Sequence, residues 1–307
     1  MKEYLIVFLK GLAMGMADIV PGVSGGTIAF ISGIYERLLN AIANIPVGFL
    51  LLLKGQFKAA WKKADATFLI ALLAGMLLSI IIFARLITWL LETHPIIVWA
   101  FFFGLVIVSC YLVGREVGKW NLWNIIAFVI GAGFAYWITV AASIQWGHDY
   151  LSIFIAGAIA ICAMILPGIS GSFILLIMGI YGFILTAVKE LNMPILLIFA
   201  AGCAFGIIAF SHALKALLRH FHDFTLALLL GTLFGSLNKV WPWKHATETY
   251  INNQGKITVV HEQNLWPWDY AEKLNLDAQL PLALLLAICG ILAVLSLEFL
   301  AKQLRTK

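Results

Sequence analysis

Charged residues are scarce in this sequence. There are 15 Asp and Glu and 20 Lys and Arg among 307 residues, and together they make up 11% of the chain. Average soluble domains are about 25% charged. Hydrophobic residues reach 63%, and the mean hydropathy is +0.99. The chain therefore lacks the polar surface that a soluble protein presents to water, which excludes a cytosolic enzyme and a disordered protein.

Cysteine and metal-ligand patterns are also sparse. The four cysteines stand in apolar runs without a CxxC pair, so we expect no disulfide framework, no zinc site and no cofactor. The net charge of +5 is not arranged as a basic stripe between exposed aromatic residues, so no nucleic-acid partner is indicated. In a membrane protein, such an excess is typical of the cytoplasmic loops.

Long apolar runs are abundant. A helix that crosses about 30 Å of hydrocarbon at about 1.5 Å per residue needs about 18 to 20 apolar residues. Runs of this length, or slightly shorter, predict spans at residues 66–91, 96–113, 122–142, 195–218, 224–240 and 280–301. We therefore expect an all-α polytopic membrane protein. Residues 241–279 form a polar loop whose tryptophans, near both ends, are typical of interfacial anchors.

Two further apolar regions, residues 4–45 and 150–188, are interrupted in the middle. The interruptions read PGVSGGT at residues 21–27 and PGISGSF at residues 167–173. Proline lacks an amide donor and clustered glycines are too permissive, so both motifs should end a helix. The resulting half-helices are too short to span comfortably, which favours a re-entrant hairpin in each region. Two kinked full spans per region are the alternative.

The two motifs belong to an internal repeat. Residues 21–35 and 167–181 are identical at nine of fifteen aligned positions. The repeat predicts two halves, residues 1–145 and 146–307, each a broken-helix hairpin followed by three spans. Such a half crosses the membrane an odd number of times, so the second half should be inverted relative to the first. Basic residues cluster in the loops that this arrangement puts in the cytoplasm, which favours an N-in, C-in orientation.

The repeated breaks suggest an anion site near the membrane midplane. Backbone amides at a helix N-terminus lack internal partners and carry the positive end of the helix dipole, and broken helices in transporters use them for anions. Phe173 replaces Thr27 in the second copy, so the copies are chemically unequal. The alternative is that the small residues only let helices pack closely. The residues expected at the site are Ser24, Gly25, Gly26 and Thr27, and Ser170, Gly171 and Ser172.

Ionisable residues at membrane depth are few and are therefore candidates for function. Arg37 has a planar guanidinium that suits phosphate oxygens, and Glu36 could hold it in place or take a proton. Asp18, just before the first break, and the repeat-equivalent pair Arg85 and His212 are candidates for a gate or for proton coupling. For the three basic residues, the alternative is snorkelling to the membrane surface.

At residues 15–42 and 166–184 the chain resembles the bacterial polyprenyl-phosphate (undecaprenyl-phosphate) translocases of the PopT type. The resemblance depends on two motifs. These are PGVSGGT with the following GIYER, and the less specific LPGISGSF with GIY. The resemblance implies transport of undecaprenyl phosphate across the bacterial cytoplasmic membrane, which recycles the lipid carrier of cell-envelope assembly. It also implies that the headgroup lies near the residues of the two motifs and Arg37.

Other functions are weighed against this one. A secondary carrier of a small soluble anion would use the same half-helix site. An enzyme is not expected, because no histidine stands in a phosphate-holding cluster and no HExxH pattern occurs. The sequence leaves open the coupling ion, the direction of transport, a homo-oligomer, the lipid chain length, the part of the second hairpin and the role of the loop at residues 241–279.

Overall fold

A computed structural model of the chain describes residues 2–19, 24–141, 146–251 and 257–305. The first three residues of PGVSGGT, Pro21 to Val23, lie outside the described residues. The first half of the chain comprises α1 (Lys2–Ile19), α2 (Gly25–Ile31), α3 (Tyr35–Ala43), α4 (Ile45–Leu53), α5 (Phe57–Lys63), α6 (Ala66–Thr93), α7 (Pro95–Glu116) and α8 (Leu122–Val140). The second half comprises α9 (Tyr150–Ile165), α10 (Gly171–Ile177), α11 (Tyr181–Lys189), α12 (Met193–His220), α13 (His222–Ser236), β1 (Lys244–Ile251), β2 (Ile257–Asn264), α14 (Pro267–Leu274) and α15 (Leu280–Arg305).

The helices are those of a multi-pass membrane protein. Within the described residues, five are long and apolar enough to cross a membrane, or six if the bent pair α10–α11 counts as one span. Four of the five, α6, α7, α8 and α12, coincide with spans expected from the sequence. The fifth is the stretch Tyr35–Leu53, which was expected to be part of the first hairpin and the start of a loop. Helix α13 has 15 residues, and α15 contributes a shorter apolar stretch, Leu280–Ser296.

Each interrupted region is broken twice rather than once. Besides the break at the PG motif, the chain turns at Gly33 and Gly179, and both have a φ of 70°. After each glycine, an amide closes the turn on the preceding helix, Ile34 onto the carbonyl of Ala29 and Ile180 onto that of Leu175. This is the left-handed glycine C-cap, and the GIY shared by both repeats encodes it. The bend between α10 and α11 is 113°.

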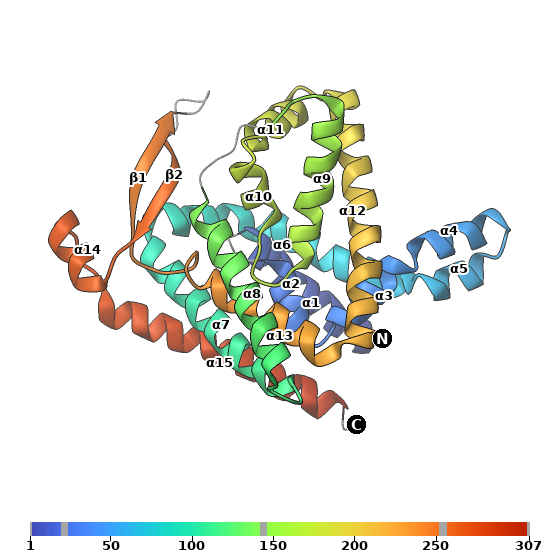
Figure 1. The fold of residues 1–307 in the computed structure, drawn as a ribbon, viewed down its shortest axis with the longest axis horizontal. Coiled ribbons are helices and arrows are strands. Elements are labelled where there is room, and N and C mark those ends of the chain that lie inside the picture. Colours follow the sequence, from blue (N-terminus) through green and yellow to red (C-terminus); the bar gives the residue numbers. More distant parts are fainter. Residues whose placement is uncertain (1, 20–23, 142–145, 252–256, 306–307) are drawn as a thin grey trace.

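The two halves of the chain have related element orders. In each, a helix is followed by short helices, four in the first half and two in the second, and then by a helix of 28 residues, α6 or α12. The residues after these long helices, His94 and Phe221, have nearly the same φ and ψ, −136° and 54° against −135° and 54°. The repeat read from the sequence therefore reappears in the local structure. Figure 1 shows both chain ends at the lower side of the molecule.

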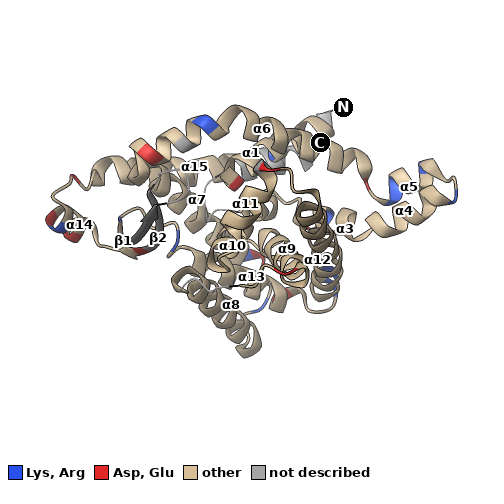
Figure 2. Ribbon diagram, turned by 90° about the horizontal axis from the view of Figure 1, so that it is seen from above, with Lys and Arg blue, Asp and Glu red and all other residues tan. Residues whose placement is uncertain are grey.

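Two segments expected as loops contain regular structure. Residues 46–65 hold α4 and α5, which project from the body as an arm that carries lysines at its outer end (Figures 1 and 2). Residues 241–279 hold the antiparallel pair β1–β2, in which Lys244 pairs with Asn264, and the short helix α14. Residues 241–279 lack a long apolar run, so hydropathy alone gave no sign of these strands and this short helix.

Close helix pairs are built on glycine. The main pairs are α1 with α6, α9 with α12, α8 with α13 and α7 with α15. A Cβ on Gly75 would overlap the carbonyl oxygen of Phe8, and a Cβ on the repeat-equivalent Gly202 would overlap that of Phe154. Small residues let membrane helices approach to backbone contact, and this close packing replaces the hydrophobic effect as the force between them.

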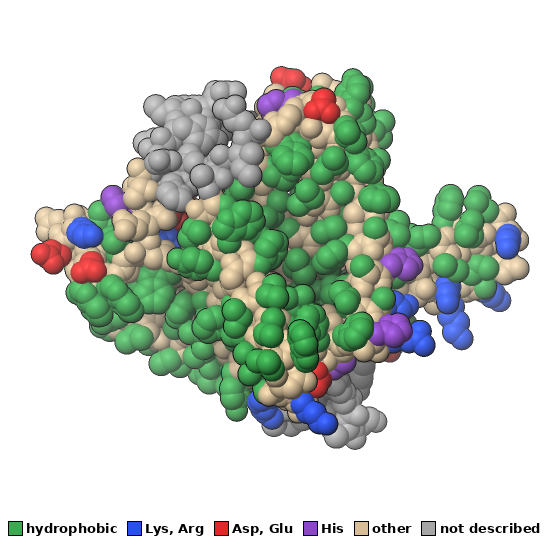
Figure 3. Space-filling view, in the orientation of Figure 1, with side chains coloured by type: hydrophobic (Ala, Val, Ile, Leu, Met, Phe, Trp, Pro, Cys, Tyr) green, Lys and Arg blue, Asp and Glu red, His purple; other side chains and the backbone are tan. Residues whose placement is uncertain are grey.

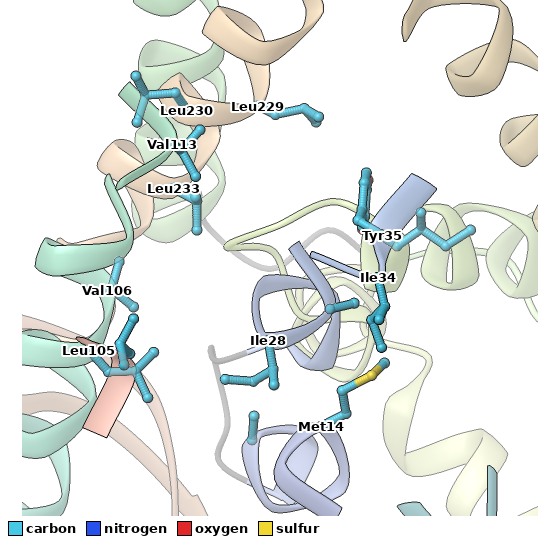
Figure 4. Packing of buried hydrophobic residues seen from close by; sticks show 14 of the residues in the cluster. Met14, Ile28, Ile34, Tyr35, Leu105, Val106, Val113, Leu229, Leu230 and Leu233 are labelled. Atoms are coloured by element: carbon cyan, nitrogen blue, oxygen red, sulfur yellow. The ribbon is translucent and has the colours of Figure 1, made fainter. Parts of the chain in front are cut away.

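The largest buried cluster lies where the first hairpin meets α7 and α13. Tyr35 is 3% exposed and its ring packs edge-on against Phe30, with centroids 5.0 Å apart. Figure 4 shows residues of α1 to α3 facing residues of α7 and α13: Met14, Ile28, Ile34, Tyr35, Leu105, Val106, Val113, Leu229, Leu230 and Leu233. This cluster fixes the first motif next to the second half of the chain.

Candidate functional site

The first motif and Tyr35 bind the backbone at the second break, in the second motif and at the end of α9 just before it. Ser24 donates its hydroxyl to the carbonyl of Met164 at 2.9 Å, and Tyr35 donates its hydroxyl to the carbonyl of Ile165 at 3.1 Å. In the other direction, the amide of Gly168 donates to the hydroxyl of Thr27 at 2.9 Å. Ser24 and Thr27 are each 1% exposed. We call this contact between the two breaks the motif junction.

The amides at the start of α2 are paired within the chain. The amide of Gly25 donates to a carboxylate oxygen of Asp18 at 2.6 Å. The amide of Gly26 donates to the Ser24 hydroxyl at 3.1 Å, and that of Thr27 to the Ser24 carbonyl at 2.9 Å. The expectation that these amides face open space for an anion therefore does not hold in this conformation. The carboxylate of Asp18 occupies the position instead.

The second motif is held by α13. The hydroxyl of Thr232 donates to the carbonyl of Pro167 at 2.9 Å. Gly168 has a φ of 85°, and a Cβ there would lie 2.8 Å from the hydroxyl oxygen of Ser236, so this turn needs glycine. The hydroxyls of Ser170 and Ser172 lie 3.0 Å apart. Gly171 packs against the carbonyl of Ala160.

Arg37 is bound by two carboxylates, and neither belongs to Glu36, the expected partner. Its Nε lies 2.6 Å from Asp65 and its Nη1 lies 2.6 Å from Glu3, while its guanidinium stacks over Phe68 at 4.5 Å. The hypothesis that Glu36 holds Arg37 is wrong, because Asp65 and Glu3 do so. In the structure Arg37 ties α1, α3 and the start of α6 together.

Glu36 instead lines two adjoining cavities, which we call the Glu36 cavities. Their volumes are about 460 Å³ and about 380 Å³, and they share Glu36, Leu218 and His222. A carboxylate oxygen of Glu36 lies 3.8 Å from the ring of His222. The larger cavity also reaches Gly33 and Tyr35, beside the motif junction. The cations that line the two cavities are Arg115, Lys215 and Arg219.

Arg85 and His212 do not reach the motif junction. Both lie on exposed faces of their helices, α6 and α12. The His212 ring nitrogen Nδ1 is 2.9 Å from the carbonyl of Ile208 on its own helix. Of the three residues expected to act as a gate or proton relay, the structure brings only Asp18 to the junction.

The sequence gave no sign of a charged cluster between the second motif and the β-hairpin. Lys239 and Lys244 both reach the same carboxylate oxygen of Glu262, at 3.0 Å and 3.3 Å. The Lys239 ammonium lies 4.5 Å from the ring centroid of Phe173, and the Lys244 ammonium 3.8 Å from that of Trp99. We call these three charged residues the lysine cluster. These residues stand in or beside a loop of mixed charge, so the sequence did not single them out.

Burial and mutual charge both act on the lysine cluster. Burial lowers the pKa of Lys244 to about 8, although the nearby Glu262 carboxylate opposes the shift. Burial would raise the pKa of Glu262, but the charges of Lys244 and Lys239 outweigh it and hold that pKa below its ordinary value. Within the described residues, no group of three His, Cys, Asp or Glu is placed to hold a metal ion.

These features together define a polytopic helical membrane protein with two broken-helix motifs that meet inside the protein. A family model described as VCA0040-like, undecaprenyl phosphate translocase-like, matches residues 14–258. The chain belongs to this family, and the resemblance read from its motifs is confirmed.

Two relatives extend this comparison. The chain is 46% identical to a polyprenyl-phosphate transporter of Vibrio cholerae serotype O1 over 302 residues, which cover 98% of each chain. It is 36% identical to a polyprenyl-phosphate transporter of Staphylococcus aureus over 256 residues, which cover 77% of this chain and 86% of the relative. No solved structure matches the chain significantly.

Proposed function

We propose that the protein carries a polyprenyl phosphate of the undecaprenyl class across the bacterial cytoplasmic membrane and so returns the lipid carrier to the cytoplasmic leaflet. The observation that carries the proposal is the motif junction, where two copies of one broken-helix sequence bond to each other in a buried position. Family membership and the names of the two relatives support the substrate class.

In this proposal the two halves are inverted repeats and each broken region is a re-entrant hairpin. The matching element order and the matching glycine turns support the repeat. The orientation is N-in and C-in. In Figure 3, most of the Lys and Arg side chains in view lie at the lower edge and around the arm at the right. Both chain ends lie on the lower side in Figure 1, and this supports the orientation.

The motif junction acts as the barrier between the two membrane faces. In inverted-repeat carriers, access alternates when one repeat moves against the other around a site near the midplane. Here the moving contact is the junction, and the headgroup passes along Ser24 to Thr27 and Ser170 to Ser172 when the junction opens. Asp18 is the gate, because its negative charge occupies the start of α2 while the junction is closed. Arg37 and Glu36 receive the headgroup on the cytoplasmic side.

The first prediction tests the junction. Replacing Thr27 by Val removes the acceptor of the Gly168 amide, and leaving a buried donor unsatisfied costs about 1–3 kcal/mol. We expect the rate of lipid translocation to change by at least about fivefold, since 1.4 kcal/mol corresponds to about tenfold. The assay uses proteoliposomes that contain a fluorescent prenyl phosphate and a reductant that quenches the outer leaflet.

The matched control is Thr225→Val. Thr225 is also 1% exposed, but its hydroxyl donates to the carbonyl of Phe221 on the adjoining turn, 2.8 Å away. This variant should translocate within about twofold of wild type. A wild-type protein that moves the prenyl alcohol as fast as the phosphate would contradict the proposal. Uptake of inorganic phosphate without lipid movement would favour a soluble-anion carrier instead.

A further inference from the structure

The lysine cluster adjoins a large apolar groove. The cluster surrounds a small cavity of about 30 Å³, and the groove beside it measures about 720 Å³. Both are lined by Asn238 and Asn264, so the two spaces are neighbours. The groove wall is mainly aromatic and aliphatic, and includes Phe103, Phe128, Tyr136, Phe234, Trp241 and Trp266. A cationic end joined to an apolar groove matches the shape of a lipid phosphate.

The charges of the cluster do not balance. Two ammonium groups share one carboxylate oxygen, which leaves an excess of one positive charge when all three groups are ionised. The Lys244 side chain is only 8% exposed, and a buried ammonium needs a compensating anion. A phosphate monoester carries about −1.5 to −2 charges at neutral pH and offers three acceptor oxygens. It would therefore satisfy both lysines better than Glu262 alone.

The cavity is small because the cluster's own ion pairs fill it. A volume of about 30 Å³ holds no more than one or two waters, because both lysines reach across to Glu262. A phosphate would take the place of the Glu262 carboxylate between the two ammonium groups. Lys239 also touches Phe173, the residue that ends the second motif, so the cluster lies directly beside that motif.

The cluster and the Glu36 cavities lie at opposite ends of one helix. Helix α13 begins at His222, which lines the Glu36 cavities, and ends at Ser236, two residues before Asn238. At about 1.5 Å per residue, its 15 residues separate the two places by about 22 Å. Figure 1 agrees, since the start of α13 lies at the lower end of the molecule and the β-hairpin at the upper left.

We propose that the lysine cluster and the adjoining groove form a second lipid-phosphate site, on the membrane face opposite the Glu36 cavities. Lys239 and Lys244 bind the phosphate, Asn238 and Asn264 line the point where headgroup and tail meet, and the groove holds the first isoprene units. Glu262 is the internal counter-ion that the phosphate replaces. This inference rests on the proposed function and adds to it the place where the lipid is received.

The test is binding of geranylgeranyl phosphate to the purified full-length protein in detergent, measured by native mass spectrometry. Lys244→Met keeps the length of the side chain but removes its charge, and we expect an affinity loss of about tenfold, or 1.4 kcal/mol. Lys273→Met, which changes an exposed lysine of α14 in the same loop, is the control and should bind as wild type does. Unchanged binding by Lys244→Met would overturn the inference.

A second variant covers the case in which Lys244→Met does not fold. Glu262→Gln keeps the shape of the cluster but removes the competing negative charge, so we expect tighter phosphate binding. If Glu262 only held the β-hairpin in place, the same change would leave the affinity unchanged or weaken it. Inorganic phosphate and geranylgeraniol are run beside the lipid phosphate, and each alone should bind at least about tenfold more weakly than the intact lipid.

The groove has its own variant. Gly133 lines the groove and a Cβ there would meet no atom within 4 Å, so Gly133→Trp is chosen to place a large side chain in the groove. It should reduce the affinity for geranylgeranyl phosphate and leave that for inorganic phosphate unchanged. Gly182→Trp, at another glycine with open space, is the control.

If lipid binding is intact but translocation is absent, the proposed function fails and this site stands. If translocation is intact but lipid binding at this site is absent, only the second lipid-phosphate site is ruled out.

Discussion

At the scale of single residues, Asp18 contributes the least expected contact of the motif junction. Asp18 was expected as a gate or coupling residue because a carboxylate is rare at membrane depth. Its partner, the amide of Gly25, could not be foreseen, since neither hydropathy nor the motif indicates which group an amide at the start of α2 meets. The contact also explains Gly25 itself, because a Cβ there would come within 2.6 Å of the Asp18 carboxylate.

This contact predicts a difference between two variants of Asp18. Asp18→Ala leaves the buried Gly25 amide without an acceptor and should destabilise the protein by about 1–3 kcal/mol. Asp18→Asn keeps an acceptor oxygen and should cost less. Thermal unfolding of the purified variants in detergent measures both. Equal melting temperatures for the two variants would show that the Gly25 amide does not depend on this side chain.

At the scale of helices, sequence reasoning succeeded where one local signal decides the structure. The proline and glycine motifs predicted breaks, and long apolar runs predicted α6, α7, α8 and α12. The turns at Gly33 and Gly179 were missed, although the repeated GIY carried the signal. The β-hairpin and the lysine cluster were missed for another reason. They depend on pairing between residues about twenty positions apart, which neither hydropathy nor the motifs report.

The glycine contacts between helices predict opposite effects for two similar changes. Gly202→Ala places a methyl group against the Phe154 carbonyl and should destabilise the α9–α12 pair by about 1–3 kcal/mol. Gly182→Ala meets open space and should be neutral or stabilise α11 by up to about 1 kcal/mol. Melting temperatures in detergent distinguish the two. Destabilisation of the same size in both variants would mean that backbone contact is not the cause.

At the scale of the whole molecule, α13 links every part of the proposed path. Its start lines the Glu36 cavities, and its Thr232 holds the second motif. The chain just after its end carries Lys239 of the lysine cluster and Asn238, which lines the cavity beside it. The sequence could predict an apolar helix where α13 lies but not this role, because each contact joins it to a distant part of the chain.

The lysine cluster predicts opposite pH trends for binding and for stability. Lys244 has a pKa of about 8 in the folded protein against 10.5 for an unperturbed lysine, and Lys239 and Glu262 are the charged groups that face it. As the pH rises through about 8, Lys244 loses its proton and affinity for prenyl phosphate should fall. Between about pH 8 and 10.5 the unfolded chain binds more protons than the folded one, so stability should rise.

Titrating geranylgeranyl phosphate at several pH values checks the first trend, and thermal unfolding without ligand checks the second. The second pKa of the phosphate is about 6, so its ionisation is nearly complete by about pH 8 and adds little to the change above that pH. Lys244→Met should abolish the fall in affinity. A fall of the same size in that variant would assign the pH dependence to another group.

The hydrogen bonds across the motif junction also bear on how such a protein arises. All three use main-chain atoms at the second break, the carbonyls of Met164 and Ile165 just before the second motif and the amide of Gly168 within it. After a gene duplication, the second copy can therefore exchange side chains without losing these bonds, whereas the first copy must keep its hydroxyl groups. The asymmetry between Thr27 and Phe173 follows from this. One copy keeps the side chains that make the motif junction, and the side chains of the other are free to diverge.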